Sequence, residues 1–278
     1  MRSPDLASVM IVTSGAAHAV VNAILKSGRD KMSSRALIDG FSALLVLPAA
    51  FFLPLPSGAW GWLAASWVTH VVYLFCLIRA FELGDMTVVY PIARGLAPAL
   101  ASVVAVSLFH EPITLPIGIG IALVSTGVMT VGFGRHAQRR AILWAAATGV
   151  TIALYTVLDA QGVRAAPSAL SYIVWTYLAI GGGIGGFFAL RRGKLFIVAA
   201  RSEWKAGLAA GAMSIVTYGL ALAAYRIGAT PRLAALREVS IVFGVGIAVV
   251  FLREKLTRSR VLGIAAIAAG AVTLLASR

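Results

Sequence analysis

Apolar residues run through the chain in long blocks, and short stretches of polar, glycine and proline residues separate them. Each block has about 17–25 residues, the length that an α-helix needs to cross the hydrocarbon core of a bilayer. The pattern predicts ten membrane-spanning helices, with no soluble domain between any two of them. We expect these helices at residues 5–26, 36–54, 60–81, 86–109, 114–133, 141–160, 168–190, 203–226, 231–252 and 258–276.

One stretch of the first half recurs in degenerate form near the C-terminus. The residues from Ala80 to Thr114 correspond to those from Ala224 to Thr257, 143 or 144 positions further on. The matched pairs are Arg94 with Arg237, Glu111 with Glu254, and Thr114 with Thr257. Each half then holds five helices, so the second half must enter the membrane from the opposite side. We therefore expect an all-α polytopic membrane protein of two inverted five-helix repeats, residues 1–137 and 138–278.

Composition supports the membrane assignment and excludes several other classes. Hydrophobic residues make up 60% of the chain and charged residues 12%, about half the charged share of soluble domains. The single cysteine, Cys76, lies in an apolar block, so no disulfide or thiolate metal framework is expected. The first apolar block, Leu6 to Leu25, is too long for a cleaved signal peptide. The net charge of +14 lies mainly in the connections, which favours a role in membrane orientation over nucleic-acid binding.

The charges predict how the chain lies in the membrane. Most of the 24 lysines and arginines fall at the connections that follow the odd-numbered helices. The opposite side holds only Arg2, Arg164, Arg226, Arg232 and Arg278. Because basic connections stay in the cytoplasm, we expect both termini outside it, in a multi-pass protein of a bacterial-type inner membrane.

The order of these features resembles the ten-helix, EamA-type branch of the drug/metabolite transporter superfamily. The resemblance rests on the turn from Ala80 to Asp85, the proline-containing fourth helix and Glu111-Pro112-Ile113-Thr114. A second copy runs from Ala224 to Gly228 and through Glu254-Lys255-Leu256-Thr257. The resemblance covers the whole chain and implies transport of small organic metabolites, with the amino-acid exporters, including those for aromatic amino acids, as the most similar members. Such members keep both termini in the cytoplasm, so the charge pattern here departs from the family.

Polar side chains recur at helical spacing inside the apolar blocks. Ser14, His18 and Asn22 are four residues apart, so they share one face of the first helix. Polar groups at such depth face protein or a water-filled cavity, since exposure to lipid is costly. We expect the residues of these stripes to line one substrate cavity, though hydrogen bonding between helices is the alternative. The candidate cavity residues are His18, Asn22, Trp67, His70, Tyr73, Tyr90, Arg94, Tyr155, Trp175, Tyr218 and Arg237.

Three charged residues leave alternatives open. Arg94 suits bidentate binding of a substrate carboxylate, but pairing with Glu111 or a backbone carbonyl is equally compatible with the sequence. Glu238 lies well inside the ninth helix, where Arg237 could offset its charge, although neighbours on a helix point about 100° apart. Asp159 either faces the same cavity or is only an interfacial charge near the end of the sixth helix. The glycine pairs Gly182 with Gly186 and Gly207 with Gly211 are expected to pack against other helices.

The sequence favours a secondary transporter of amino acids or related metabolites, working as a monomer without a cofactor. No nucleotide-binding loop is present, so transport would be coupled to protons or run down the substrate gradient. Exporters of drugs or sugar-type metabolites are the alternative within transport. An intramembrane enzyme would need a metal-binding or acidic motif that the sequence lacks, and a channel would show a filter or rings of like residues.

Overall fold

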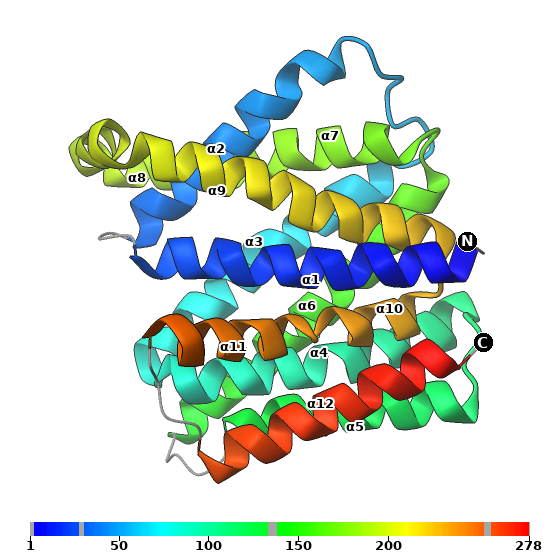
Figure 1. Ribbon diagram of the computed structural model, residues 1–278. Helices are drawn as coiled ribbons and strands as arrows, with labels where there is room; N and C mark the ends of the chain where they lie inside the picture. The colour runs from blue at the N-terminus through cyan, green and yellow to red at the C-terminus, as the bar shows by residue number, and fades with distance from the viewer. Residues whose placement is uncertain (1–2, 28–30, 133–137, 253–256, 278) are drawn as a thin grey trace.

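A computed structural model describes residues 3–27, 31–132, 138–252 and 257–277 (Figure 1). Within these ranges the backbone forms helices and no β-strand. The helices are α1 Ser3–Ser27, α2 Lys31–Ala50, α3 Trp60–Leu83, α4 Met86–Phe109, α5 Leu115–Val131, α6 Arg139–Ala165, α7 Ala169–Ala179, the π-helix η1 Ile180–Gly185, α8 Gly186–Arg192, α9 Lys194–Ile227, α10 Thr230–Arg237, α11 Ser240–Leu252 and α12 Arg258–Ala276.

These elements make up ten helical segments, because two of the predicted spans are built from more than one element. The helices α7, η1 and α8 follow one another directly, and a single turn separates α10 from α11. Within the described ranges, six segments are long and apolar enough to cross a membrane, and α5 is a shorter apolar helix. The prediction of an all-α polytopic membrane protein is confirmed.

The second helix has different limits from those predicted. The expected range was 36–54, whereas α2 runs from Lys31 to Ala50. Its polar first turns are helical because they pack against other segments, and the buried Ser34 donates a hydrogen bond to Glu203 of α9 at 3.2 Å. The helix ends at Ala50, and a hydrogen-bonded turn over Phe51 to Leu53 leads to Pro54.

The eighth predicted helix is also longer than expected. The prediction was 203–226, whereas α9 begins at Lys194 and ends at Ile227. Residues 194–202 contain no glycine or proline, so nothing in them stops a helix. The helix therefore continues into a segment that the hydrophobic pattern placed in a connection.

Helices that are distant in the sequence lie side by side (Figure 1). The helices α1 and α2 pack against α9, α3 and α4 pack against α6, and α5 packs against α12. Both termini lie at the same end of the bundle. Each of these contacts joins the first half of the chain to the second, so the two halves are interleaved.

The glycine-rich stretch of the seventh segment packs through a different pair of glycines from the pair predicted. An added Cβ on Gly182 or Gly186 would meet no atom within 4 Å. The close contacts belong to Gly181 and Gly185. A Cβ on Gly181 would lie 2.5 Å from the carbonyl oxygen of Asp39, and a Cβ on Gly185 would lie 3.0 Å from the Cβ of Asp39. Both pairs have the same spacing, and only the packing against α2 selects between their faces.

The predicted packing role of the other glycine pair is confirmed. Gly207 and Gly211 of α9 both face α2. A Cβ on Gly207 would lie 3.0 Å from the Cβ of Leu37, and a Cβ on Gly211 would lie 3.0 Å from the Cβ of Phe41. Small residues let two helix backbones approach closely inside a membrane.

Four glycines join α5 to α12 backbone to backbone. A Cβ on Gly120 would lie 3.1 Å from the carbonyl oxygen of Gly270, and a Cβ on Gly270 would lie 2.7 Å from that of Gly120. The same reciprocal relation links Gly127 to Gly263, at 2.8 and 2.7 Å. Gly263 follows Gly120 by 143 residues, and Gly270 follows Gly127 by the same number, which is also the offset between Arg94 and Arg237.

Candidate functional site

Arg94 of α4 and Glu238 form a buried ion pair. The Nη2 atom of Arg94 lies 3.0 Å from Oε1 of Glu238, and the side chains are 7% and 4% exposed. Burial of a charge is costly unless an opposite charge accompanies it, so each residue makes the other tolerable. The alternative that paired Arg94 with Glu111 is therefore wrong: Arg94 pairs with Glu238, and Glu111 pairs with Arg164.

A break in the ninth predicted helix brings Glu238 to this position. The sequence favoured one continuous helix over 231–252, but α10 ends at Arg237 and α11 begins at Ser240. The N–H of Glu238 donates to Ala235 at 3.0 Å, a three-residue spacing typical of a 3₁₀ turn. Helix α1 approaches this turn closely, since a Cβ on Gly15 would lie 3.2 Å from the carbonyl oxygen of Arg237.

A small cavity with room for about one water molecule lies beside the ion pair. Side chains of α4, α6, α9 and the α10–α11 turn surround it, among them Thr156, Tyr225 and Arg237. The Nε atoms of Arg94 and Arg237 and the Oε2 atom of Glu238 are buried here without a hydrogen-bond partner among the described residues. Such groups normally find partners in proteins, so this cavity has unused donors and an unused acceptor.

Tyr218 of α9 connects Arg237 to the buried carboxylate of Asp159. The Arg237 guanidinium lies 5.0 Å from the centre of the Tyr218 ring, a cation–π contact. The Tyr218 hydroxyl donates to one oxygen of Asp159, and the Tyr172 hydroxyl donates to the other at 2.8 Å. Asp159 is fully buried, so its interpretation as an interfacial charge is wrong. Its two phenol donors supply the hydrogen bonds that a buried carboxylate requires.

The predicted residues of α3 and α6 form an aromatic cluster with Tyr218. The ring of His70 stacks on Tyr155 at 4.1 Å and meets Tyr218 edge-on at 6.3 Å. Tyr73 packs on Tyr155 at 5.5 Å, again edge-on. The Nδ1 atom of His70 lies 2.9 Å from the carbonyl oxygen of Ser66, one turn earlier, which fixes the orientation of the imidazole ring.

The two predicted tryptophans lie between α3 and α7. The Trp67 indole donates to the carbonyl oxygen of Ala179 at 3.0 Å, just before the π-helix. Trp175 packs edge-on against Trp60 at 5.2 Å, and its indole nitrogen has no hydrogen-bond partner among the described residues. Both residues are half-buried, and neither lines the cavity beside Arg94.

The remaining candidates are less closely connected to the ion pair. Tyr90 is half-buried on α4, one turn before Arg94. His18 is half-buried on α1, the helix that packs against α10 and α11. The side chain of Asn22 lies outside the described part of the structure.

A second polar network, which the sequence did not reveal, lies at the end of the bundle that carries the termini. Arg164 of α6 donates to Glu111 at 2.6 Å, and also to the carbonyl oxygens of Tyr225 and Gly228. Glu111 in turn accepts from the backbone N–H of Thr230 at 2.7 Å, at the start of α10. The sequence marked Glu111 as part of a motif. The one signal for its partner Arg164 is that both residues lie near helix ends on the same predicted side of the membrane. Its counterpart Glu254 lies outside the described residues.

Comparison with known proteins adds a family to this geometry. Residues 139–276 match the model of the EamA-like transporter family. No curated protein matches the chain in sequence. One solved structure, described only as "Crystal structure of protein", is 18% identical and has a TM-score of 0.77, covering 98% of this chain and 96% of its own. At this identity the likeness shows the fold alone.

Proposed function

We propose that this chain, whose second half places it in the EamA-like transporter family, is a secondary transporter of amino acids or related small zwitterions. Family membership supports a multi-pass membrane transporter. The substrate class, the direction of transport, the alternating-access mechanism and the location in a bacterial inner membrane are our proposals.

One observation carries the assignment to zwitterions. The cavity beside the Arg94–Glu238 pair contains buried guanidinium donors and a buried carboxylate acceptor that are without hydrogen-bond partners. A substrate carboxylate matches the guanidinium groups of Arg94 and Arg237, and a substrate ammonium matches Glu238. An amino acid presents these two groups one carbon apart. A substrate with only one charge would leave part of this chemistry buried and unpaired, which is costly.

The aromatic cluster next to Arg237 supports a substrate with an apolar or aromatic side chain. Tyr218 contacts Arg237 through its ring and His70 through its edge, so the cluster begins where the charged groups end. Rings of this kind provide apolar surface with a few polar groups that orient a ligand. The cavity in this structure is too small for an amino acid, and we infer that the substrate enters when the helices around it separate.

Alternating access requires two halves that can exchange their roles, and several contacts support such a relation between residues 1–137 and 138–278. The packing of α3 on α6 corresponds to that of α9 on α1 when the halves are exchanged. A Cβ on Gly149 would lie 2.9 Å from the carbonyl oxygen of Ala93, and a Cβ on Gly15 would lie 3.2 Å from that of Arg237. Inverted repeats with a site at their interface are a recurrent design of transporters.

We assign the basic end of the bundle to the cytoplasm and the end with the termini to the outside. Arg139, Arg140, Arg191 and Lys194 lie at the first end, whereas Arg164 and Glu111 neutralise each other at the second. On this assignment the Glu111 network links helix ends at the outer face, and we propose net export as the physiological direction.

Counterflow in liposomes tests the substrate class. Liposomes with the purified protein, preloaded with phenylalanine, should accumulate labelled phenylalanine. Phenethylamine lacks the carboxylate and phenylpropionate lacks the ammonium, so neither should compete with it. The Glu238→Gln variant should lose counterflow, whereas Glu82→Gln, at an exposed position away from the site, should retain it. Uptake of sugars or of amines alone, without amino acids, would favour the runner-up function, an exporter of sugar-type metabolites or drugs.

A further inference from the structure

Helix α9 is too long to lie entirely within a membrane. Its 34 residues span about 51 Å at 1.5 Å per residue, whereas the hydrocarbon core is about 30 Å thick. Its C-terminal part carries Tyr218 into the bundle, so the excess length is at the N-terminal end. There Gly193, with a positive φ of 49°, joins it directly to α8. From this length and the direct junction with α8, we infer that residues 187–205, which we call the elbow, lie at the membrane surface.

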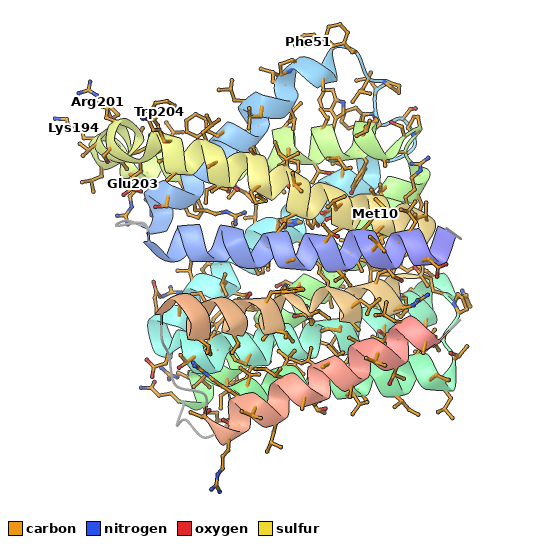
Figure 2. All side chains as sticks on the ribbon, viewed as in Figure 1. Met10, Phe51, Lys194, Arg201, Glu203 and Trp204 are labelled. Atoms are coloured by element: carbon orange, nitrogen blue, oxygen red, sulfur yellow. The ribbon has the colours of Figure 1, made fainter. Side chains whose placement is uncertain are left out.

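The exposed face of the elbow carries a basic stripe. Lys194, Arg201 and Lys205 are separated by seven and four residues, so they project from the same side of α9, and all three are exposed. Figure 2 shows Lys194 and Arg201 pointing away from the end of the bundle. The acidic residue of this segment, Glu203, is half-buried and accepts a hydrogen bond from Ser34 of α2, so it does not belong to the stripe.

Apolar side chains border the stripe on both sides. Leu195 is 61% exposed on one side, and Ile197 and Trp204 are 52% and 45% exposed on the other. The Lys205 ammonium lies 5.7 Å from the centre of the Trp204 ring, and the Arg191 guanidinium lies 5.9 Å from that of Phe187. Cations are thus held beside rings at the depth where lipid headgroups meet acyl chains.

We propose that the elbow is a binding site for an anionic phospholipid. The stripe of Lys194, Arg201 and Lys205 contacts the headgroup phosphate, and Leu195, Ile197 and Trp204 contact the upper acyl chains. A zwitterionic headgroup offers no net charge to this stripe, and free phosphate makes no use of its apolar borders. Basic residues near a membrane surface attract anionic lipids in this way, and an aligned stripe concentrates that attraction at one place.

The test compares two variants that remove the same charge from the same end of the bundle. Lys194→Gln/Arg201→Gln alters the stripe, and Arg139→Gln/Arg140→Gln alters an exposed pair at the start of α6. Native mass spectrometry of the detergent-solubilised full chain measures the affinity for phosphatidylglycerol, phosphatidylcholine and inorganic phosphate. Loss of two contacts should weaken the binding of phosphatidylglycerol to the stripe variant about thirtyfold. The α6 variant should bind it as the parent does.

Three results would overturn the proposal. Equal weakening in both variants would mean that only the diffuse charge of this end attracts lipid. Equal binding of phosphatidylcholine by the parent would mean that the site does not select anionic headgroups. Binding of phosphate that competes with the lipid at equal strength would make the ligand a free anion. The melting temperature in phosphatidylcholine should match the parent for both variants, and Lys194→Arg/Arg201→Lys should retain lipid binding if the stripe variant proves unstable.

Discussion

Gly127 of α5 and Gly263 of α12 face each other so closely that the backbone of each fills the place where the other would carry a side chain. The contact is reciprocal, and Gly120 and Gly270 repeat it further along the same two helices. Such a contact between backbones brings Cα–H groups onto carbonyl oxygens. A two-fold relation between the halves would produce this pattern, because each contact then maps onto the other.

Alanine at position 127 should destabilise the protein by about 1–3 kcal/mol, because its methyl group has no room. The nearest obstacles are the carbonyl oxygen of Gly263 at 2.8 Å and the nitrogen of Ile267 at 2.9 Å, which are backbone atoms that cannot rotate away. Gly118 on the same helix has open space, so Gly118→Ala is the control. Thermal unfolding in detergent should show a lower melting temperature for Gly127→Ala alone; two identical curves would contradict the contact.

Two adjacent glycines in the seventh segment should respond differently to the same change. A Cβ on Gly181 would meet the carbonyl oxygen of Asp39 at 2.5 Å, whereas a Cβ on Gly182 would meet nothing. We expect Gly181→Ala to lower the melting temperature, and Gly182→Ala to leave it unchanged or raise it slightly, since alanine favours a helix over glycine. The reverse order would mean that the face chosen from the sequence, and not the observed one, packs against α2.

Hydrophobic blocks were sufficient to predict ten helices but not their limits. The limits failed where polar residues are helical because they pack against other segments, as at the start of α2, and where no glycine or proline ends a helix, as at the start of α9. The break after Arg237 also escaped prediction, because no glycine or proline marks it. That break depends on contacts with α1 and α4 that the local sequence does not contain.

The polar residues inside apolar blocks identified several residues that the structure brings together around the ion pair and the aromatic cluster, but not their partners. Arg94, Arg237, Tyr218 and His70 stood out because lipid exposure would be costly there. Pairing is a property of tertiary structure, so the sequence offered Glu111 or a backbone carbonyl as the partner of Arg94 and did not identify Glu238. Asp159 looked peripheral from its place near a helix end, yet α7 and α9 bury it.

The orientation of the chain can be read from two exposed positions at opposite ends of the bundle. Ser57 lies in the connection beside the end of α6, at the end with the termini, and Gln138 precedes α6 at the basic end. With Cys76 replaced by serine, Ser57→Cys should react with an impermeant maleimide in whole cells, and Gln138→Cys only after lysis. The opposite result would place the termini in the cytoplasm, as the family resemblance implies, and the orientation predicted from the charge pattern would be wrong.

A double substitution separates the structural role of the Arg94–Glu238 pair from its role in transport. Arg94→Met leaves Glu238 buried without its partner, and we expect a loss of about 3–5 kcal/mol in stability. Adding Glu238→Met removes the orphaned charge, so the double variant should regain most of this loss, because apolar residues of similar volume often replace a buried ion pair at little cost.

Transport should not recover with stability. If the pair binds the two charged groups of the substrate, the double variant should have a melting temperature near that of the parent and no counterflow of phenylalanine in liposomes. Stability is measured by thermal unfolding in detergent, and transport by counterflow of the same preparation after reconstitution, so that misfolding cannot be mistaken for loss of the site. Parental counterflow in the stable double variant would show that the pair only holds α4 against the α10–α11 turn, and the substrate site would then have to lie elsewhere, with the aromatic cluster around His70 and Tyr155 as the next place to test.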